Sequence, residues 1–520
     1  MFPQAILARA AAPCRAAARP SSSIFRAAAA MPLRAKLLPQ QQPQSRMMSS
    51  SSFAHFNPCP NDDPEDVLFQ SLYGLRTIEL NRPSKLNALN GSMIRKIAPR
   101  LLEWSKSDMA NVIVIKGAGR KGFCAGGDVQ QLVEWNRDPT IDGPAKSAAY
   151  FAQEYKLNHL IATYNKPYIA FMDGFTMGGG VGLSIHAPFR IATENTVFSM
   201  PETTIGFFPD VGASFFLPRM AGEVGTWLAL TSGQLKGVNA FYAGVATHYL
   251  HSSSLNALES RLAELRFKDY DQMSRRLEIV NDTIEEFVTG LPWEEPMAVA
   301  GEVRRAIDRC FGFDTVDEIM QALKEEEKNE VTGEWAMKTL NTLHLRSPTS
   351  VHVTLKQMRI GKTWSIAEAF KREHSIATKF MSYPDFNEGV TAKLVEKPRR
   401  VPMWQPASLE RFAEKKDWKE LVGSFFLVDD KGPKFNLLSE ETYDKYPFKN
   451  FGVPTEEEVE QKVAEGKFKS RAEVLEHFVR ERRQKQGVEV VVSEILLRKT
   501  KEGKKGLTWV YGEEAPGQQE

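Results

Sequence analysis

Three short segments of the chain carry residues whose types and spacing suit acyl-transfer chemistry. Two are glycine-rich turns, at residues 122–128 and 174–182, and each follows a short apolar run. Consecutive glycines let backbone amides approach a ligand closely, and amides at the start of a helix stabilise negative charge. The third segment, residues 200–212, places two carboxyl groups, Glu202 and Asp210, in an apolar stretch bent by Pro and Gly. Such surroundings raise the pKa of a carboxyl group and suit it to acid/base work.

The three segments indicate more together than apart. Two glycine turns can supply two amides to one developing oxyanion, while two acids can activate water and orient a hydroxyl group. Taken singly, each has a plainer interpretation. The glycines could form tight turns before helices, and the carboxylates could be a pair of solvated loop acids. The combination therefore predicts acyl transfer, which no single segment does.

Other kinds of catalytic site fit the sequence poorly. The glycines of residues 178–182 match neither G-x-G-x-x-G nor a P-loop, and the chain has no G-x-S-x-G motif. His186 and His248 lack metal-ligand spacing with other donors. Cys124 lies inside the first glycine turn, where a small packed residue is a better interpretation than a nucleophile. We therefore predict no metal site and no redox cofactor.

The elements that must position these segments follow an α/β pattern. Residues 67–80 alternate as two short strands around a central turn, and residues 92–104 carry apolar side chains at helical spacing. Residues 112–115 and 168–172 are apolar runs typical of buried strands. Strands separated by helices predict parallel βαβ units.

The second half of the chain has a helical pattern and then a boundary. Residues 255–380 show apolar side chains at helical spacing, with helices predicted over 314–328 and 348–358. Three prolines between residues 398 and 406 break this pattern. We therefore predict a separate C-terminal region at residues 405–520.

This C-terminal region has its own signals. Thr455, with Glu458 three residues later, predicts a capping box at a helix start, and residues 488–497 predict a strand. Two basic clusters occur at residues 480–485 and 498–505. They could contact a partner, but a charge run is usually a solvated face, and we adopt that interpretation for each.

Composition limits the classes of function. The 520 residues are 42% hydrophobic and carry a formal net charge of +2, so whole-chain charge favours neither nucleic-acid nor membrane binding. No apolar run approaches the ~20 residues of a membrane span. The four cysteines lie far apart and form no metal or disulfide pattern, which fits a reducing compartment.

The first residues have the composition of a targeting leader. Residues 1–60 contain no acid, the first being Asp62. Seven basic residues are spread among Ala, Ser, Pro and Gln: Arg9, Arg15, Arg19, Arg26, Arg34, Lys36 and Arg46. An Arg-rich, Ser-rich, acid-free leader is typical of a mitochondrial transit peptide, whereas a merely disordered tail has no reason to exclude acids. We therefore expect residues 1–60 to direct the protein to the mitochondrial matrix.

The motifs also resemble a known family. Over about residues 69–404 the chain is similar to the crotonase superfamily, because its motifs occur in that family's order and spacing. The resemblance implies a ββα spiral core with the active site at residues 61–255, a helical part at 256–404 that completes the catalytic domain, and an extra α+β extension at 405–520. The motifs are Asn81-Arg-Pro-Ser-Lys-Leu-Asn-Ala88, Phe123-Cys-Ala-Gly-Gly-Asp128, Met177-Gly-Gly-Gly-Val-Gly-Leu183 and Pro201-Glu-Thr-Thr-Ile-Gly-Phe-Phe-Pro-Asp-Val-Gly212.

The resemblance assigns roles to the acids and the glycine turns. It implies that the amides of Ala125 and Gly179 form an oxyanion hole for a thioester carbonyl. Glu202 matches the family's catalytic glutamate, either as a base for water or as a nucleophile. Asp210 matches an aspartate typical of the hydrolases of this family, and Glu154 matches a further substrate-contacting acid.

The resemblance also points to the binding of coenzyme A. The loop from Lys85 to Ala88 would embrace the adenine end, and Gly127 and Asp128 would be further substrate-binding positions. Enoyl-CoA hydratases of the family carry a second glutamate just after the glycines, where this chain has Gly182. This departure makes hydration of a double bond a weaker hypothesis.

Three functions follow in order of preference. The first is hydrolysis of a short branched hydroxyacyl-CoA, because the chain is most similar to the branch that hydrolyses 3-hydroxyisobutyryl-CoA in valine catabolism. Coenzyme A is then part of the substrate, and no separate cofactor is needed. The second is a structural role in the mitochondrial small ribosomal subunit, because fungal mitochondria contain a relative there and the basic extension could contact that partner. The third is an enoyl-CoA hydratase or isomerase.

Overall fold

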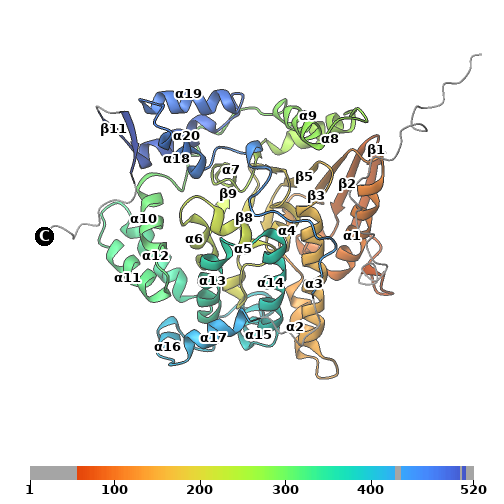
Figure 1. Ribbon diagram of the computed structural model, residues 1–520. Coiled ribbons are helices and arrows are strands. Elements are labelled where there is room, and N and C mark those ends of the chain that lie inside the picture. The colour runs from red at the N-terminus through yellow and green to blue at the C-terminus, as the bar shows by residue number, and fades with distance from the viewer. Residues whose placement is uncertain (1–55, 428–434, 504–505, 511–520) are drawn as a thin grey trace, which may run out of the picture. The chain divides into compact units, whose positions relative to one another are not determined.

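The computed structural model describes residues 56–427, 435–503 and 506–510. The leader predicted at residues 1–60 therefore lies almost wholly outside the described residues. All of the described residues belong to one folded unit (Figure 1). None of the helices they form is long and apolar enough to cross a membrane.

A six-stranded sheet forms one layer of the fold, in the order β1-β2-β3-β5-β7-β10. Its first two strands form the antiparallel hairpin predicted for residues 67–80, and the remaining neighbours are parallel, as expected for βαβ units. The strands are β1 Val67–Leu72, β2 Leu75–Leu80, β3 Val112–Gly117, β5 Tyr168–Met172, β7 Phe189–Ala192 and β10 His248–Tyr249.

A smaller four-stranded sheet continues the spiral, in the order β4-β6-β8-β9. Strand β4 follows β3, β6 follows β5 and β8 follows β7, so each turn of the chain contributes one strand to each sheet. The first three strands are parallel, and β9 is antiparallel to β8. The strands are β4 Gly122–Cys124, β6 Phe175–Met177, β8 Val197–Ser199 and β9 Gln234–Lys236.

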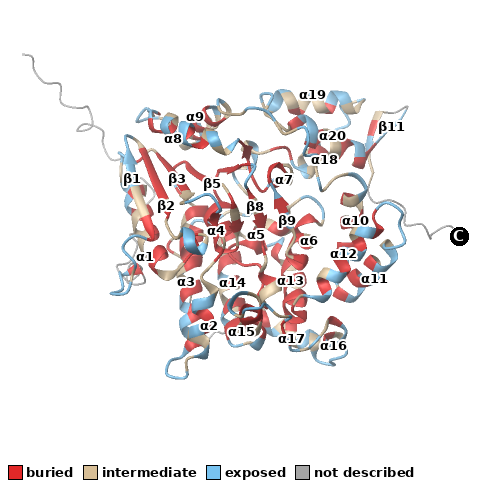
Figure 2. Cartoon of the chain, turned by 180° about the vertical axis from the view of Figure 1, so that it is seen from behind, coloured by how far each residue is buried: buried red, intermediate tan, exposed pale blue. Residues whose placement is uncertain are grey.

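Helices cover these sheets through amphipathic faces. The helix predicted at residues 92–104 is α1, Gly91–Lys106, whose start is fixed by the Asn90 side chain accepting a hydrogen bond from the Met93 amide. Its Ile94 and Ile97 are fully buried. Truncating either to Ala would cost roughly 2–5 kcal/mol, because the cavity would be only partly refilled. Figure 2 shows buried residues filling the strands and the helix faces turned toward them.

The helical pattern predicted for residues 255–380 is confirmed. The helix expected at 314–328 is α11, with a capping box at Thr315 and Glu318, and the one at 348–358 lies within α13. The helices of this part include α8 Leu255–Ala263, α9 Met273–Glu285, α10 Gly301–Phe311, α11 Val316–Glu326, α12 Gly333–His344, α13 Pro348–Gly361, α14 Ile366–Met381 and α15 Pro384–Val390.

The C-terminal extension contains α17 Trp418–Phe425, α18 Glu456–Ala464, α19 Arg471–Glu481 and α20 Val488–Lys499, followed by a hairpin of β11 Thr500–Gly503 and β12 Gly506–Trp509. The capping box at Thr455 and Glu458 is confirmed. The strand predicted at 488–497 is wrong, because these residues lie in α20. The β-branched composition suggested a strand, yet burying apolar residues at helical spacing outweighs that preference. The buried ones are Val488, Val491, Val492, Ile495 and Leu496.

Within the extension, residues 435–448 form a segment without regular structure that lies against the catalytic part. Phe435 stacks on His374 of α14, with ring centroids 4.4 Å apart. Farther along, the carbonyl oxygen of Glu441 lies 2.9 Å from His159 Nε2, and the Tyr446 hydroxyl donates to the Ala187 carbonyl at 2.5 Å. The extension is therefore packed against the core rather than tethered to it.

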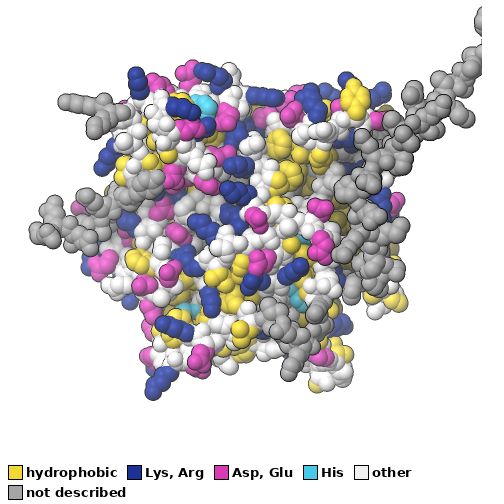
Figure 3. All heavy atoms as spheres, in the orientation of Figure 1, with side chains coloured by type: hydrophobic (Ala, Val, Ile, Leu, Met, Phe, Trp, Pro, Cys, Tyr) yellow, Lys and Arg dark blue, Asp and Glu magenta, His cyan; other side chains and the backbone are white. Residues whose placement is uncertain are grey.

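The interpretation of the basic clusters as solvated faces is wrong for their buried members. Lys485 pairs with Glu285 of α9, and Arg498 lies 2.8 Å from Glu456. Arg482 lies 2.9 Å from the capping residue Glu458. These cations hold the extension together and fix it to the core. Over the region of α19 in Figure 3, basic and acidic side chains are interspersed.

Candidate active site

The three segments predicted to carry chemistry follow three adjacent parallel strands. The first glycine turn follows β4, the second follows β6, and the acidic segment follows β8. Register pairs Cys124 with Thr176 and Met177 with Ser199, so the strands end side by side. Because the carboxyl ends of parallel strands open at one edge of a sheet, the segments converge there. The sequence predicted the segments, and the sheet brings them together.

The two glycine turns place two free amides side by side. Gly179 is the first residue of α4, Gly179–Ser184, and the amides of a first helical turn have no partner within the helix. A Cβ atom at position 179 would lie 3.3 Å from the Gly127 nitrogen. Within the described residues, no hydrogen bond from the amide of Gly127 or Gly179 is found. Two adjacent N–H groups of this kind can bind one oxyanion.

The structure corrects one of the two predicted amide donors. The Ala125 amide donates to the Leu86 carbonyl at 3.0 Å, so it is already used. Gly127 lies opposite Leu89 in a parallel bridge. The hydrogen bonds of this bridge join Leu89 to the Gly126 carbonyl and the Asp128 amide, so the Gly127 N–H points away from Leu89. In the first glycine turn the free amide is therefore that of Gly127 and not that of Ala125, and the Gly179 amide is free as the prediction requires.

Two acids lie on either side of the second glycine turn. A Cβ atom at Gly179 would lie 2.5 Å from Glu154 Oε1, and one at Gly178 would lie 2.9 Å from Glu202 Oε1. A side chain at either position would therefore displace a carboxyl group, and Gly178 also has a φ of 42°, which favours glycine. Glu154 comes from α3, Gly143–Ala162, and Glu202 begins the short helical turn η5, Glu202–Ile205.

The third predicted acid, Asp210, completes a buried cluster. Glu154, Glu202 and Asp210 are 2%, 5% and 4% exposed, respectively, so water screens none of them. Glu154 Oε1 and Glu202 Oε2 have no hydrogen-bond partner among the described residues, whereas Asp210 Oδ2 accepts from the Tyr155 hydroxyl at 2.7 Å. No cation forms an ion pair with any of the three within the described part of the chain.

Burial controls the protonation of this cluster. It raises the pKa of Glu154 and Glu202 well above the usual value, and the nearby Asp210 carboxylate adds to the effect. Burial also raises the pKa of Asp210 to about 7, although the Tyr155 hydroxyl opposes the shift by stabilising the anion. Burial therefore favours the protonated form of each of the three carboxyl groups, and the Tyr155 hydroxyl partly offsets this for Asp210 by stabilising its anion.

Comparisons with known proteins identify the family of the chain. A family model described as enoyl-CoA hydratase/isomerase matches residues 75–421. The chain belongs to this family. Its crotonase fold is also that of a carnitinyl-CoA dehydratase from Mycobacterium thermoresistibile, with a TM-score of 0.61 and 32% identity over 72% of this chain and all of that one.

Curated relatives of this crotonase carry two kinds of name. The small ribosomal subunit protein mS47 of Neurospora crassa is 59% identical over 90% of this chain and 92% of its own. The mitochondrial 3-hydroxyisobutyryl-CoA hydrolase of Danio rerio is 41% identical over 67% of this chain and 88% of its own. The mS47 protein of Schizosaccharomyces pombe is 41% identical over 69% of this chain and 81% of its own.

The predicted adenine loop is rigid and tied to the first glycine turn. Asp128 accepts from Arg82 at 2.8 Å and from Lys85 at 3.1 Å. The buried Asn87 donates to the carbonyls of Ala118 and Gly122 at 2.9 and 2.8 Å. The contact between Lys85 and Asp128 thus connects the loop to the turn that contains Gly127. Arg82 also donates to the Ala88 carbonyl, which connects the end of the loop to the same contacts.

The space behind Gly182 is already filled. A Cβ atom there would lie 2.7 Å from Val211 Cβ and 2.8 Å from Asn158 Nδ2. A glutamate at this position would therefore collide with α3 and with the residue after Asp210. Position 182 therefore has neither the glutamate that hydratases of this family carry there nor the room for one.

Sequence reasoning missed the polar residues of α3 that support the acids. Tyr155 binds Asp210, and the Asn158 side chain is fully buried beside the second glycine turn. A signal was available, because α3 is buried on nearly all sides yet carries Glu154, Tyr155 and Asn158. Polar residues in such a helix are costly unless they serve a site. Cys124 fits its predicted packing role, since burial raises the pKa of its thiol to about 12.

Proposed function

We propose that this chain hydrolyses a short hydroxyacyl-CoA thioester, with 3-hydroxyisobutyryl-CoA as the first substrate to test. One observation carries the proposal, namely that the buried Glu154 and Glu202 lie beside the turn with the free Gly179 amide, near Asp210, and that no described cation forms an ion pair with the three acids. Amides aimed at a carbonyl oxygen stabilise the charge that develops during acyl transfer. Carboxyl groups with raised pKa values can move protons near neutral pH.

The geometry supports the following mechanism. The thioester oxygen accepts from the Gly127 and Gly179 amides, which polarises the carbonyl carbon. Glu202 passes its proton toward Asp210 and then acts as a carboxylate. As a base it takes a proton from water while the hydroxide adds to the carbon, and then returns that proton to the departing thiolate. As a nucleophile it attacks the carbonyl carbon and the thiolate leaves, which gives a mixed anhydride. Water then hydrolyses this anhydride and restores the Glu202 carboxylate. Asp210, held by Tyr155, is the proton store in either route.

Hydration of a double bond is disfavoured for a physical reason. Hydration needs an acid and a base, one for each carbon of the double bond. Hydratases of the family carry their second glutamate at the position of Gly182, where Val211 and Asn158 leave no space for a side chain. The isomerase and hydratase hypotheses therefore rank below hydrolysis.

The test is free-thiol release from (S)-3-hydroxyisobutyryl-CoA by the chain from residue 56 onward. We expect Glu202→Gln and Asp210→Asn to lower kcat by roughly 10²–10⁴-fold, because each removes a proton-transfer group. Glu456→Gln, which changes a partly buried acid of the extension, should leave kcat unchanged. If the folded protein releases no thiol above the level of the variants, and leaves crotonyl-CoA unhydrated, the enzymatic proposal is wrong.

A second function is favoured by how much of this chain one relative matches. The Neurospora crassa mS47 protein matches 90% of this chain, whereas the Danio rerio hydrolase matches 67%. A match of 473 residues must include part of the extension, so this part is shared with a ribosomal protein. We propose that the chain also joins the mitochondrial small ribosomal subunit, in the matrix. Sedimentation of mitochondrial lysate at increasing salt tests this: comigration with the small subunit supports it, and a position only at the top of the gradient contradicts it.

A further inference from the structure

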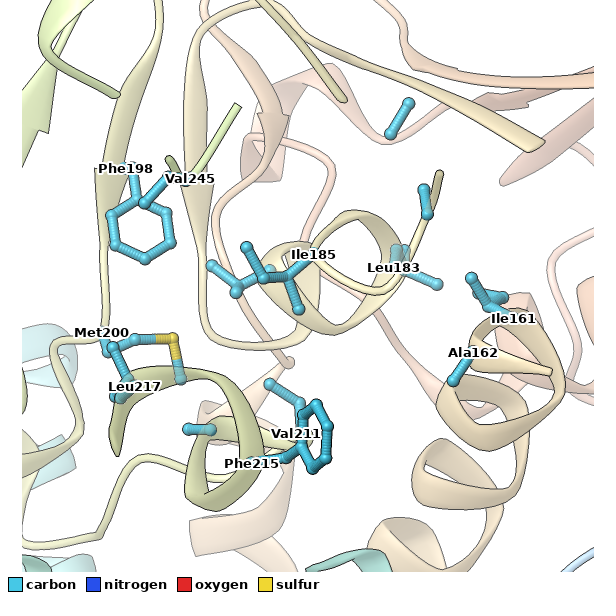
Figure 4. Close-up of a cluster of buried hydrophobic side chains, with 14 of the residues drawn as sticks. Ile161, Ala162, Leu183, Ile185, Phe198, Met200, Val211, Phe215, Leu217 and Val245 are labelled. Atoms are coloured by element: carbon cyan, nitrogen blue, oxygen red, sulfur yellow. The ribbon is translucent and has the colours of Figure 1, made fainter. Parts of the chain in front are cut away.

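The loop that carries Asp210 has a backbone that its residues do not favour. Val211 has a φ of 55° and Gly212 a φ of 89°, both in the left-handed region. For a β-branched residue such as Val this region is a genuine outlier, because Cβ crowds the backbone. Strained residues of this kind persist only where their surroundings hold them, and they cluster at functional sites. Figure 4 shows Val211 packed beside Phe215.

One buried acid holds this loop from behind. Glu373 of α14 is fully buried. Its Oε2 accepts from the Gly212 amide at 2.7 Å, and its Oε1 accepts from the Ser214 amide at 2.9 Å and also from the Ser214 hydroxyl. On the other side of the loop, His186 Nε2 lies 2.8 Å from the Val211 carbonyl oxygen.

We propose that Glu373 is a positioning residue, which fixes the strained loop so that Asp210 meets Tyr155 and faces Glu202. The inference rests on the proposed hydrolysis. Both Glu373 oxygens bind amides within four residues of Asp210, and Tyr155, which binds Asp210, comes from α3, against which α14 packs. Helix α3 thus holds the Asp210 side chain through Tyr155, and helix α14 holds the backbone that follows Asp210 through Glu373.

A purely architectural role explains Glu373 poorly. A buried carboxyl group without a cation is costly, and no Lys, Arg or His forms an ion pair with Glu373 among the described residues. Burial raises its pKa to about 8, although the Gly212 and Ser214 bonds oppose that shift. An apolar side chain would fill the volume at lower cost, but it could not satisfy two amides held at a fixed spacing.

The matched variants are Glu373→Gln and Glu456→Gln, which exchange a fully buried acid and a partly buried acid, respectively, for the amide. Glu373→Gln sets an NH2 group against an amide donor and frees the loop. Displacing a catalytic group by about 1 Å can cost roughly 100-fold in rate, so we expect kcat to fall toward that extent while KM stays within about twofold. Glu456→Gln should change neither constant. Ser214→Ala removes one donor only and should lower kcat by a few-fold in a protein that folds normally.

Crystal structures of the two Glu373-linked variants separate this inference from the proposed activity. We expect the 2.7 Å contact between Tyr155 and Asp210 to be lost in Glu373→Gln and lengthened in Ser214→Ala. An unmoved Asp210 with unchanged kcat overturns the positioning role. If the parent protein releases no thiol, the proposed hydrolysis fails, and the displacement of Asp210 alone then decides whether Glu373 positions it. If Glu373→Gln does not fold, Ser214→Ala decides, and an unchanged Asp210 in that variant overturns the inference.

Discussion

Carboxyl groups are fully buried in one region of the molecule and partly buried in another, and their surroundings are opposite in charge. In the acidic cluster, Glu154, Glu202 and Asp210 are buried together, and no cation of the described residues forms an ion pair with them. In the seam between the extension and the core, Glu456 lies 3.2 Å from Arg304 and 2.8 Å from Arg498. Burial would raise the pKa of Glu456, but these arginines outweigh it and lower the pKa. The same side chain is thus kept reactive in one region and fixed as an ion pair in the other.

The difference shows what each region is for. An acid paired with Arg is a permanent anion and cannot exchange protons near neutral pH. An acid left without a cation costs free energy, which a fold tolerates where the group has chemistry to perform. The seam therefore holds the extension in place, and the cluster is the part that fits catalysis.

The largest effect should come from breaking the seam. Arg498→Met removes the cation shared by Glu456 and Glu494 and leaves both acids without it. Removing one partner of a buried pair costs roughly 4 kcal/mol, so unfolding of the extension should shift to lower denaturant. Urea titration with limited proteolysis measures this, and kcat for thiol release should stay unchanged. Loss of activity without loss of stability would contradict the separation of the two regions.

A second prediction acts on the cluster and should spare the seam. In Gly179→Ala the new methyl group would lie 2.5 Å from Glu154 Oε1 and 3.3 Å from the Gly127 nitrogen. We expect it to disrupt the amide pair and lower kcat by roughly 100-fold, or about 3 kcal/mol of transition-state stabilisation. The matched control is Gly423→Ala in α17, where the nearest atom, Lys356 Nζ, is 3.7 Å away. Equal activity of the two variants would exclude Gly179 from the oxyanion site.

The sequence predicted the parts of the site better than their exact use. The strand at 112–115, the helix at 92–104 and the three motifs follow from local periodicity and glycine spacing, and the structure contains them. Which amide is free does not follow, because the Leu89–Gly127 bridge orients the turn through residues far away in the chain.

The extension was predicted less well for the same reason. Val488 and its apolar neighbours form a helix because the faces of α18 and α19 lie against it. Lys485 looked like a solvated cation, but α9 supplies Glu285 to bury it. Both errors concern residues whose surroundings are formed by segments distant in sequence. Neither the spacing of apolar residues nor the number of charged residues in a segment can show those surroundings.

A third prediction concerns the cost of the catalytic cluster. Because burial raises the pKa of Asp210 to about 7, ionising it in the folded protein costs free energy that the unfolded chain does not lose. Asp210→Asn removes this cost and should raise Tm at pH 8 by roughly 2 °C while lowering kcat. Scanning fluorimetry at pH 5 and pH 8 tests it, since the gain should be smaller at pH 5. A lower Tm at pH 8 would mean that Asp210 stabilises the fold.

The smallest effect distinguishes the two regions by the sign of their pH dependence. Asp210 has a folded pKa raised from 3.8 to about 7, so its region loses stability as pH rises from about 4 to about 7. Glu285 in the seam behaves oppositely. Burial would raise its pKa, but His248 and Lys485 lower it from 4.5 to about 2. Its contribution is therefore present above pH 4.5 and is lost as pH falls through about 2.

Amide hydrogen exchange can follow both regions in one experiment. From pH 6 to pH 3, after correction for intrinsic exchange, we expect protection to fall around Glu285 and Lys485, while it holds or rises around Tyr155 and Asp210. His248, whose pKa burial lowers to about 4, becomes charged in the same range and disturbs the seam further. A parallel loss in both regions would mean that the two sets of acids share one environment. Opposite trends would show that the Asp210 carboxyl, without a cation, and the paired Glu285 carboxyl respond to protons in opposite directions.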